Sequence, residues 1–395
     1  MNEIRPFAGW RFAREPKPRL APPYDVISAS ERERFAAHPE NIVHLTLPVA
    51  ADGSPDYAGA GRLLQRWIQE GVLVRDAREA LYVVEERIAD GRVRRGFLAL
   101  VRLADYAQRA VLPHERTMRG PIEDRLKLTR EVRANLEPLF FLYEDRYGEL
   151  DAQLRVELAE DCATSASPDG TGLTFGALRD PGAIAKVRAY LEARPVIIAD
   201  GHHRYETMLH YRDECRAQGL RDPAAGHEYV MAYLVNAFDP GSRVQAIHRL
   251  LKGTVASVEE TLRKQDFAIE ELGSVGPDVL LERVARASER ECAYVFVRPG
   301  GSALLARRAR DASLDIEVLH RDVLPALGGE LSFDANTERV LATLRERAAS
   351  LAILPAPIPP DTLFRVVQAG TRLPQKSTYF APKIPTGLVL RTLDG

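Results

Sequence analysis

The sequence predicts a mixed α/β protein with two or more packed units, and three observations lead to that prediction. Its 395 residues, 45% hydrophobic and 28% charged, can bury a large core. Apolar runs of strand length alternate with stretches in which apolar residues recur at helical spacing. The pattern changes near Gly253, so we expect an N-terminal region, 1–253, and a C-terminal α+β region, 254–395.

The first part of the chain combines proline-rich extended segments with helices and strands. The residue before each proline is pushed towards extended geometry, so we expect loops and strands over residues 22–27 and 42–47. Helical spacing predicts helices at 30–37, 57–70, 121–136, from about Leu150, and at 184–193. Apolar runs predict strands at 80–85, 96–101 and 138–143, with the hairpin signal Asp90-Gly91 between the first two.

The central segment places a short apolar strand directly before a polar turn. Residues 195–199 run into Asp200-Gly201, and helical spacing follows over 205–217. A strand is expected at 228–237. In the C-terminal region the spacing predicts helices at 255–265, 279–287 and 316–327, and paired strands at 293–298 and 303–307.

Composition excludes several classes of function. Lys and Arg number 54 against 56 Asp and Glu, so the net charge of −2 supplies no bulk attraction to nucleic acid or to acidic membranes. The three cysteines form no Cys-x-x-Cys pair, which argues against a disulfide framework. The first residues lack the apolar stretch of a signal peptide, and the sequence has no apolar stretch of membrane-spanning length, so we expect an unexported protein. We expect a cytoplasmic protein that acts on a small molecule.

The densest cluster of chemistry-bearing residues is Asp200-Gly201-His202-His203-Arg204, at the predicted strand-to-helix turn. A helix that begins there presents backbone N–H groups that favour a phosphate or carboxylate, and glycine allows close approach. Arg204 adds a bidentate donor, and His202 and His203 can donate, accept or move a proton. Asp200 could coordinate a magnesium ion that bridges phosphates.

A structural interpretation of the same residues stays open. Asp200 would then cap the helix, Arg204 would pair with Glu206 or another surface carboxylate, and one histidine would pack in the core. Zinc is not expected. The phrase His203-x-x-Glu206 begins like an inverzincin site, but Thr207 stands where the second histidine belongs.

A second cluster lies at His114-Glu115-Arg116, ahead of a predicted helix. Glu115 is a candidate general base, and His114 and Arg116 are candidate substrate contacts. Nearby arginines would lower the pKa of a carboxyl group and burial would raise it, so the sequence leaves its protonation open. A solvated charged face is the alternative interpretation.

A third cluster is Lys376-Ser377-Thr378, which offers a charge and two hydroxyls of the kind that bind phosphate. The segment from Gly370 nearly spells a Walker A loop, but Gln375 replaces the second glycine, so a P-loop is not assigned. An edge strand kept soluble by its lysine is an equal alternative.

Several phrases, in this order, resemble a widespread prokaryotic family known as domain-of-unknown-function family ten-fifteen. The shared phrases are Pro22-Pro23-Tyr24-Asp25-Val26-Ile27, Asn41 to Leu45, His114 to Thr117, Ile198 to Thr207, Pro374 to Phe380, and Pro382-Lys383. The Asp200–Arg204 phrase also resembles the nucleotide-binding signature of the ParB and sulfiredoxin-like superfamily, which includes free-serine kinases.

The resemblance implies an α/β, sulfiredoxin-like core in which the strand-turn-helix motif grips phosphates and an upstream glutamate serves as base. Carried onto this sequence, Asp200, His202, His203 and Arg204 become phosphate or metal contacts, and Glu115 the candidate base. Similar proteins encoded beside serine-pathway genes suggest serine or phosphoserine as substrate.

These features together predict a phosphotransferase. A nucleotide or pyrophosphate held with magnesium would give its phosphate to the hydroxyl of serine or a similar small metabolite. Asp200, His203 and Glu115 would be catalytic, and Lys376, Ser377 and Thr378 would join Gly201, His202 and Arg204 in binding phosphate. Two alternatives stay open: a nucleotide-dependent switch that recruits a partner without turnover, and a magnesium-dependent phosphohydrolase.

Overall fold

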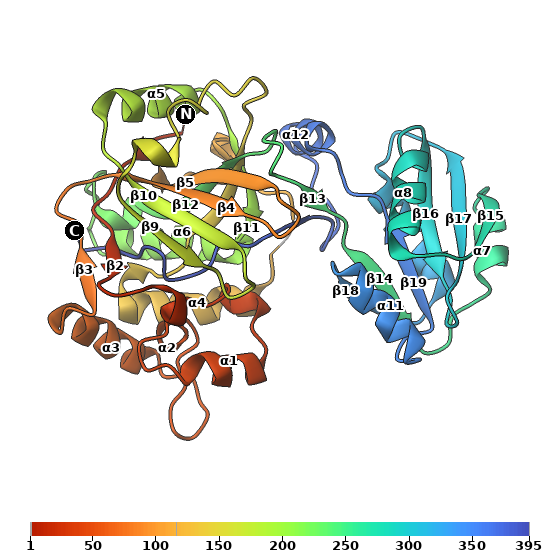
Figure 1. The fold of residues 1–395 in the computed structure, drawn as a ribbon, viewed down its shortest axis with the longest axis horizontal. Helices are drawn as coiled ribbons and strands as arrows, with labels where there is room; N and C mark the ends of the chain where they lie inside the picture. Colours follow the sequence, from red (N-terminus) through yellow and green to blue (C-terminus); the bar gives the residue numbers. More distant parts are fainter. Residues whose placement is uncertain (1, 116, 395) are drawn as a thin grey trace. The chain divides into compact units, whose positions relative to one another are not determined.

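The computed structural model describes residues 2–115 and 117–394, and internal contacts divide the chain into two compact units (Figure 1). The first unit runs to Arg243 and takes up the chain again at Pro382. The second spans Val244–Ala381. The sequence suggested one boundary near Gly253, whereas these contacts divide the chain earlier and return the C-terminal tail to the first unit.

In the described residues, the first unit is built on a nine-stranded sheet. The path runs β6-β11-β8-β12-β5-β4-β10-β9, and β1 pairs with β5. The pairs β6–β11 and β8–β12 are parallel and the others antiparallel, so the predicted α/β class with mixed sheets is confirmed. The strands are β1 (Ile4–Arg5), β4 (Leu81–Arg87), β5 (Val93–Arg102), β6 (Val111–Leu112), β8 (Leu139–Tyr143), β9 (Glu160–Ala166), β10 (Gly172–Leu178), β11 (Val196–Asp200) and β12 (Tyr229–Asn236).

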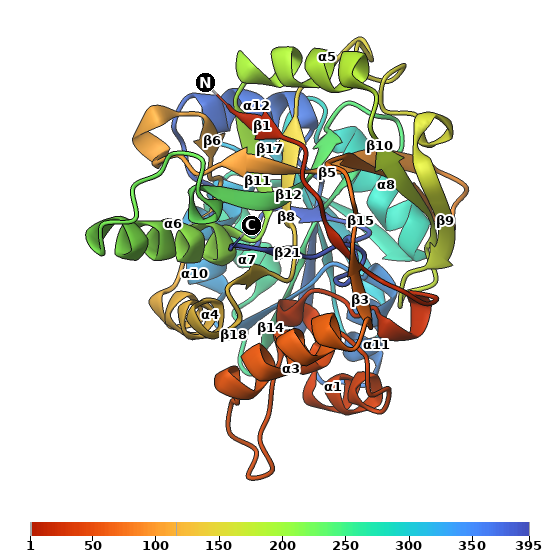
Figure 2. The same ribbon diagram turned by 90° about the vertical axis from the view of Figure 1, so that its left-hand side faces the viewer.

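Helices cover this sheet and extend the core of the first unit. They are α1 (Ala29–Ala36), α2 (Val43–Thr46), α3 (Tyr57–Gln69), α4 (Arg119–Val132), α5 (Pro181–Glu192) and α6 (His202–Ala217). Helix α4 packs against both α3 and α6, so the three lie in succession along one side of the unit (Figure 2). Helix α6 buries Tyr205, Met208 and Tyr211 in the same apolar cluster as the central strands, which fixes its first turn against the sheet.

Two predicted elements differ from the structure. Residues 42–47 were expected to be extended but contain α2, because the Asn41 side chain accepts a hydrogen bond from the Val43 N–H at 2.9 Å and Leu45 is buried in the helical core. The helix predicted from about Leu150 is also wrong. The chain there makes turns and a short 3₁₀ helix at Val156–Leu158, since the Asp145 carboxylate accepts from the N–H of Leu150 at 2.9 Å.

The C-terminal tail is held in the first unit by short strands and a buried charge pair. Strand β21 (Arg391–Thr392) pairs with β7 (Ala134–Asn135), and a separate ladder joins β2 (Trp10–Phe12) to β3 (Leu73–Arg75). Arg94 is fully buried, binds both oxygens of Glu86 at 2.6 and 2.8 Å, and also donates to the Pro382 carbonyl. A buried guanidinium needs all these acceptors, so the start of the tail is fixed beside the sheet.

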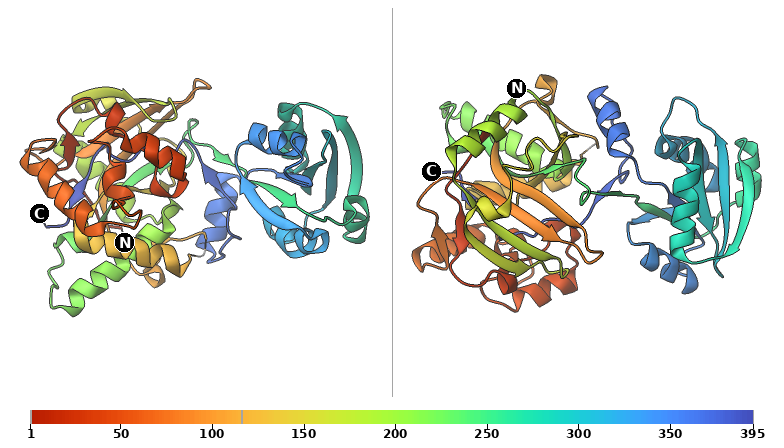
Figure 3. Two further views of the ribbon diagram at one scale, coloured as in Figure 1. Left: turned by 90° about the horizontal axis from the view of Figure 1, so that it is seen from below. Right: turned by 45° about the horizontal axis from the view of Figure 1, so that its top comes forward.

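The second unit has its own sheet and core (Figure 3). Its sheet is antiparallel, in the order β15-β17-β16-β19-β14-β18. The strands are β14 (His248–Lys252), β15 (Ala268–Ser274), β16 (Glu291–Val297), β17 (Ser302–Ala309), β18 (Glu330–Asp334) and β19 (Leu351–Pro355), with β13 (Val244–Gln245) and β20 (Tyr379–Phe380) paired separately. The helices are α7 (Val258–Lys264), α8 (Pro277–Ala287), α9 (Asp315–Val318), α10 (Leu324–Leu327), α11 (Thr337–Arg345) and α12 (Pro360–Gln368).

Leu280 of α8 and Val340 of α11 pack with β16 residues in the core of the second unit, and β16 and β17 are the strand pair predicted around Gly300-Gly301. In the part of the chain that the structure describes, no helix has the length and apolar character needed to cross a bilayer.

Candidate active site

The topology of the first sheet brings together two clusters that are far apart in the sequence. Strands β6 and β11 are parallel neighbours, with Val111 opposite Val196. Parallel neighbours end at the same edge of a sheet, where ligands commonly bind in α/β folds. The chain therefore leaves β6 at Leu112, towards Pro113, His114 and Glu115, at the edge where β11 ends at Asp200.

Gly201 makes the turn between β11 and α6 in a conformation that favours glycine. Its φ of +93° lies in the left-handed region, and an added Cβ would lie 2.8 Å from Leu139 Cδ2 and 3.0 Å from Arg204 Nη2. Gly201 is also the N-cap of α6 and has no side chain to accept from the first turn. The N-terminal end of α6 therefore keeps the backbone groups and dipole that favour an anion.

Asp200 lies between two cations that hold its carboxylate. Oδ1 is 2.7 Å from Lys383 Nζ, and Oδ2 accepts from Arg204 Nη2 at 2.7 Å. Burial acts to raise the pKa of Asp200, but Lys383 and then Arg204 outweigh it and hold the pKa well below its usual range. Asp200 is thus ionised at neutral pH and pairs with Lys383 of the tail. Its side chain does not cap α6, and Arg204 pairs with Asp200 and not with Glu206.

Arg204 and Lys383 each reach a further carboxylate. Arg204 donates to the Pro138 carbonyl at 2.8 Å and lies 4.0 Å from Glu137, while Lys383 lies 3.2 Å from Asp25. Burial raises the pKa of Glu137 although Arg204 opposes it. These charges form one network that joins β11, α6, the tail and the segment that contains Asp25.

Sequence reasoning did not include Lys383, Asp25 and Glu137 among the site residues. Two of them carried a signal, since Asp25 lies in the phrase Pro22–Ile27 and Lys383 in the phrase Pro382-Lys383. Glu137 carried none, because a glutamate between a helix and an apolar strand is common in any sequence.

His202 and His114 pack against each other below this turn. Their ring centroids are 4.6 Å apart, the backbone N–H of His114 donates to His202 Nε2 at 3.3 Å, and His114 Nδ1 lies 2.7 Å from the Ile198 carbonyl oxygen. Burial, followed by His114, lowers the pKa of His202 to about 3. The lowered pKa favours the neutral ring at pH 7, and the assignment of His202 to phosphate binding stays a prediction.

His203 and Glu206 hold Thr117 and Met118 against the first turns of α6. His203 Nε2 accepts from the Met118 N–H at 3.0 Å, and Thr117 Oγ1 donates to Glu206 Oε2 at 2.7 Å. Glu115 Oε1 lies 3.7 Å from His114 Nε2, and the Glu115 carboxylate acts to raise the pKa of His202. The candidate base thus lies close to the N-terminal end of α6.

The remaining predicted site residues are Arg116, Lys376, Ser377 and Thr378. Arg116 is outside the described residues, so its assignment as a substrate contact stays a prediction. Lys376, Ser377 and Thr378 belong to the second unit, in a loop that leads from α12 to β20, and Ser377 Oγ donates to the Pro374 carbonyl at 2.6 Å. No helix follows that loop as a P-loop would require. Their assignment to phosphate binding also stays a prediction.

The arrangement around Asp200 does not fit the magnesium ion that the sequence suggested. Both carboxylate oxygens face cations, Lys383 and Arg204, whereas magnesium needs free oxygen ligands. Among residues 2–115 and 117–394, no group of three His, Cys, Asp or Glu side chains is arranged to hold a metal. We derive no step through a metal at this site.

The cavities beside Arg204 are small. One of about 10 Å³ is lined by Asp200, Arg204 and Lys383, and another of about 50 Å³ is lined by Arg125, Glu137 and Arg204 together with apolar side chains. The first has room for about one water molecule.

Comparisons with known proteins place these features in context. Residues 4–325 match the family described as "Protein of unknown function (DUF1015)", and no curated protein matches the chain. A conserved hypothetical protein from Pyrococcus furiosus has 14% identity and a TM-score of 0.38, with 75% of this chain and 95% of that chain covered. A mutant free serine kinase in complex with AMP has 14% identity and a TM-score of 0.41, with 75% and 92% covered.

A third solved structure, SbnI with a C-terminal truncation from Staphylococcus aureus, has 11% identity and a TM-score of 0.39, with 75% of this chain and 87% of that chain covered. At these TM-scores the likeness is too distant to carry an argument about activity.

Proposed function

This chain belongs to the DUF1015 family of proteins of unknown function, and from that premise we propose that it is a phosphotransferase whose active site lies at the N-terminal end of α6. The family predicted from the sequence phrases is thereby confirmed. Membership of this family does not identify a reaction. The proposal takes the chemistry implied by the sequence resemblance and rests on the contacts around Glu115 and α6.

One observation carries the proposal: Thr117 and Met118, which lie close to Glu115 in the sequence, are held to the first turns of α6 by two hydrogen bonds, Met118 N–H to His203 and Thr117 to Glu206. This contact keeps the Glu115 carboxylate close to a helix N-terminus, where a phosphate is stabilised by backbone N–H groups and by the dipole. A base beside a phosphate site is what phosphoryl transfer to a hydroxyl needs.

In the proposed step, a nucleotide or pyrophosphate binds with its terminal phosphate at the N-terminal end of α6. Glu115 accepts the proton of the acceptor hydroxyl, and the hydroxyl oxygen forms a bond to phosphorus. The bond from phosphorus to the bridging oxygen breaks, and its electron pair stays with the departing phosphate or nucleotide. Serine, or a small metabolite with a similar hydroxyl, is the proposed acceptor.

The charge network around Asp200 contributes to this step by holding the turn before α6 in place. Lys383 and Arg204 lock the carboxylate of Asp200, and Gly201 and the first turn of α6 follow it directly. A rigid turn keeps the N–H groups aimed at the phosphate before the donor binds, so little reorganisation is needed in the transition state. Asp200 raises the pKa of Lys383 against the effect of burial, so the lysine stays charged and keeps its pair with Asp200.

The test separates binding from transfer. We expect Glu115→Gln to leave the affinity for the donor within about twofold and to lower the rate of transfer by roughly 10²–10⁴-fold, the usual contribution of a general base. Glu131→Gln, which changes an exposed glutamate on α4, is the matched control and should retain both. Transfer at the wild-type rate by Glu115→Gln would contradict the role of this residue.

A further inference from the structure

A larger pocket lies in the first unit, away from the turn at Asp200. Its volume is about 470 Å³, within the range of small-molecule sites. The wall comes from the N-terminal strand β1, the end of β3, helix α5, the 224–229 loop and strand β21. The N–H of Asn2 donates to the carbonyl of Glu192 at 3.1 Å, which joins the N-terminal segment to the end of α5.

Arg391 lines this pocket and is 8% exposed. Its hydrogen bonds all come from Nη1, which donates to Gly226 O at 2.9 Å, to Tyr229 O at 3.0 Å and to Asn135 Oδ1 at 3.4 Å. In residues 2–115 and 117–394 no carboxylate pairs with Arg391, and neither Nε nor Nη2 has a hydrogen-bond partner. Burial lowers the pKa of Arg391 to about 10, so the side chain stays charged at pH 7.

Two exposed arginines line the same pocket, Arg75 at the end of β3 and Arg188 on α5. Neither forms an ion pair in the described part of the chain. The wall also contains one exposed carboxylate, Glu79, whose charge is opposite to that of the arginines. The excess of guanidinium groups over carboxylates is the feature that attracts an anion.

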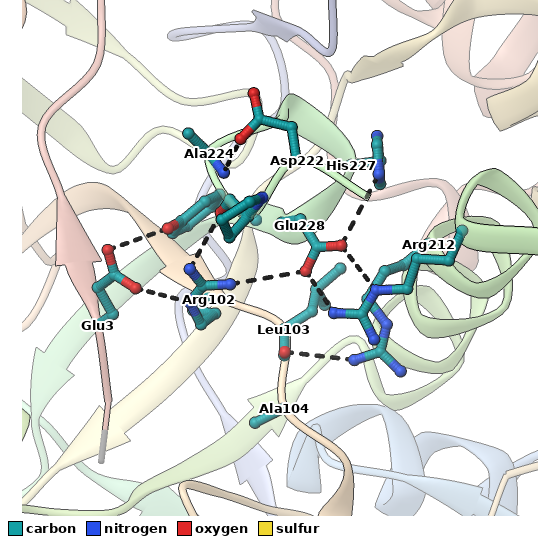
Figure 4. Close-up of polar contacts among 12 residues, drawn as sticks. Glu3, Arg102, Leu103, Ala104, Arg212, Asp222, Ala224, His227 and Glu228 are labelled. Atoms are coloured by element: carbon teal, nitrogen blue, oxygen red, sulfur yellow. Dashed lines mark hydrogen bonds and ion pairs between the residues drawn. The ribbon is translucent and has the colours of Figure 1, made fainter. Parts of the chain in front are cut away.

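The other carboxylates near the pocket are already neutralised (Figure 4). Glu3 pairs with Arg5 at 2.5 Å and with Arg102 at 2.6 Å, and it accepts from the Tyr229 hydroxyl at 3.0 Å. Burial acts to raise the pKa of Glu3, but these partners lower it to about 2. Glu3 therefore balances Arg5 and Arg102 and does not compensate the charge of Arg391.

Glu228 is balanced in the same way. It pairs with Arg216 at 2.5 Å and lies 3.6 Å from Arg102, which Figure 4 shows between Glu3 and Glu228. The nearby Arg212 pairs with Asp105 at 2.8 Å. Among residues 2–115 and 117–394, these pairs leave Arg391, Arg75 and Arg188 as the arginines of the pocket that have no carboxylate partner.

We propose that this pocket is a second binding site, for a small metabolite that carries phosphate or carboxylate groups, with Arg391 at its buried end and Arg75 and Arg188 at its mouth. Guanidinium groups bind both kinds of oxyanion in a bidentate manner. The proposal does not depend on phosphoryl transfer at α6.

The test uses the full chain and isothermal titration calorimetry with two probes, glycerol phosphate and citrate, which separate the phosphate source from the carboxylate source. Arg391 donates to three acceptors of the fold, so its substitution would mix folding with binding. The variants are therefore Arg75→Glu and Arg188→Glu at the mouth, with Arg66→Glu on α3 as the matched control, because Arg66 is exposed and lies outside the pocket wall.

We expect one equivalent of at least one probe to bind, and each mouth variant to weaken it by at least about tenfold, the loss of one charge-assisted hydrogen bond. Binding of glycerol phosphate alone would assign a phosphorylated ligand, and binding of citrate alone a polycarboxylate. The proposal is overturned if neither probe binds at millimolar concentration, or if Arg66→Glu weakens binding as much as the mouth variants do.

Discussion

Lys383 Nζ lies 2.7 Å from Asp200 Oδ1, so the C-terminal tail supplies a cation to the end of β11. Arg204, one turn into α6, takes the other oxygen of the same carboxylate. The strand-to-helix turn is therefore fixed from both sides, by a residue of its own helix and by a residue from the far end of the chain.

Removing the tail cation should destabilise the first unit. Lys383→Met leaves a buried carboxylate with Arg204 alone, and we expect a loss of about 3 kcal/mol in the free energy of unfolding, at the low end for a broken buried pair. Trp10 and Trp67 are the only tryptophans and both lie in the first unit, so tryptophan fluorescence in urea reports on that unit.

The double variant Lys383→Met with Asp200→Asn is the control for this pair. If the two residues act through their contact, the double variant loses less than the sum of the single variants. Additive losses would contradict the coupling.

The neutral, buried state of His202 predicts a dependence of stability on pH. Its folded pKa, about 3, lies below the unfolded value near 6.5, so its contribution is full above pH 6.5 and is lost as the pH falls towards 3. The groups around it are His114, Glu115, Asp200 and His203. Below pH 6.5 we expect its share of the loss to be about 1.4 kcal/mol per pH unit.

Urea unfolding at pH values from 7.5 to about 4.5 measures this dependence. His202→Gln should give a flatter curve than the wild type in that window. Parallel curves would show that His202 is not the group that titrates.

Gly201→Ala should lower the free energy of unfolding by more than the strain of a left-handed backbone alone. Gly219, at φ +90° with no atom within 4 Å of an added Cβ, is the matched site, and its substitution by alanine should cost about 1–2 kcal/mol. At Gly201 the Cβ also meets Leu139 and the Arg204 guanidinium, so we expect at least about 1 kcal/mol more in urea unfolding. Equal costs would argue against close packing at this turn.

Thr117 is expected to act as a positioning residue for Glu115. Thr117→Val removes the hydrogen bond to Glu206, and we expect transfer to slow by roughly tenfold, about 1.4 kcal/mol, with donor affinity unchanged. Thr117→Ser keeps the hydroxyl and should restore the rate. A loss in donor affinity without a change in rate would place Thr117 in binding instead.

The sequence predicted the strand, turn and helix around Asp200 because their signals are local. An apolar run ends in Asp-Gly and helical spacing follows, and the structure has β11, Gly201 and α6 at those positions. The proximity of Glu115 to α6 could not be predicted from spacing, since it depends on the parallel pairing of β6 with β11. Long-range strand order has no local signature.

Sequence reasoning missed Lys383 for the same reason, because its position depends on contacts between residues far apart in the chain. Lys383 reaches Asp200 because the tail returns to the first unit, held by Arg94 and by β21, whereas the sequence placed it in the C-terminal region. The extended prediction at 42–47 failed for a different reason. Apolar residues in a short run suit a buried helix turn as well as a strand, and the side chain of Asn41 decides between them.

The most direct test of the account is phosphorus NMR of the purified chain with serine and, separately, ATP, ADP, CTP or pyrophosphate, with and without magnesium. The account predicts a phosphoserine signal with one of these donors, which is lost in Asp200→Asn and in Glu115→Gln but kept in Glu131→Gln. If every donor stays unconsumed by the wild-type chain, or if Asp200→Asn and Glu115→Gln form phosphoserine at the wild-type rate, phosphoryl transfer at the N-terminal end of α6 is contradicted.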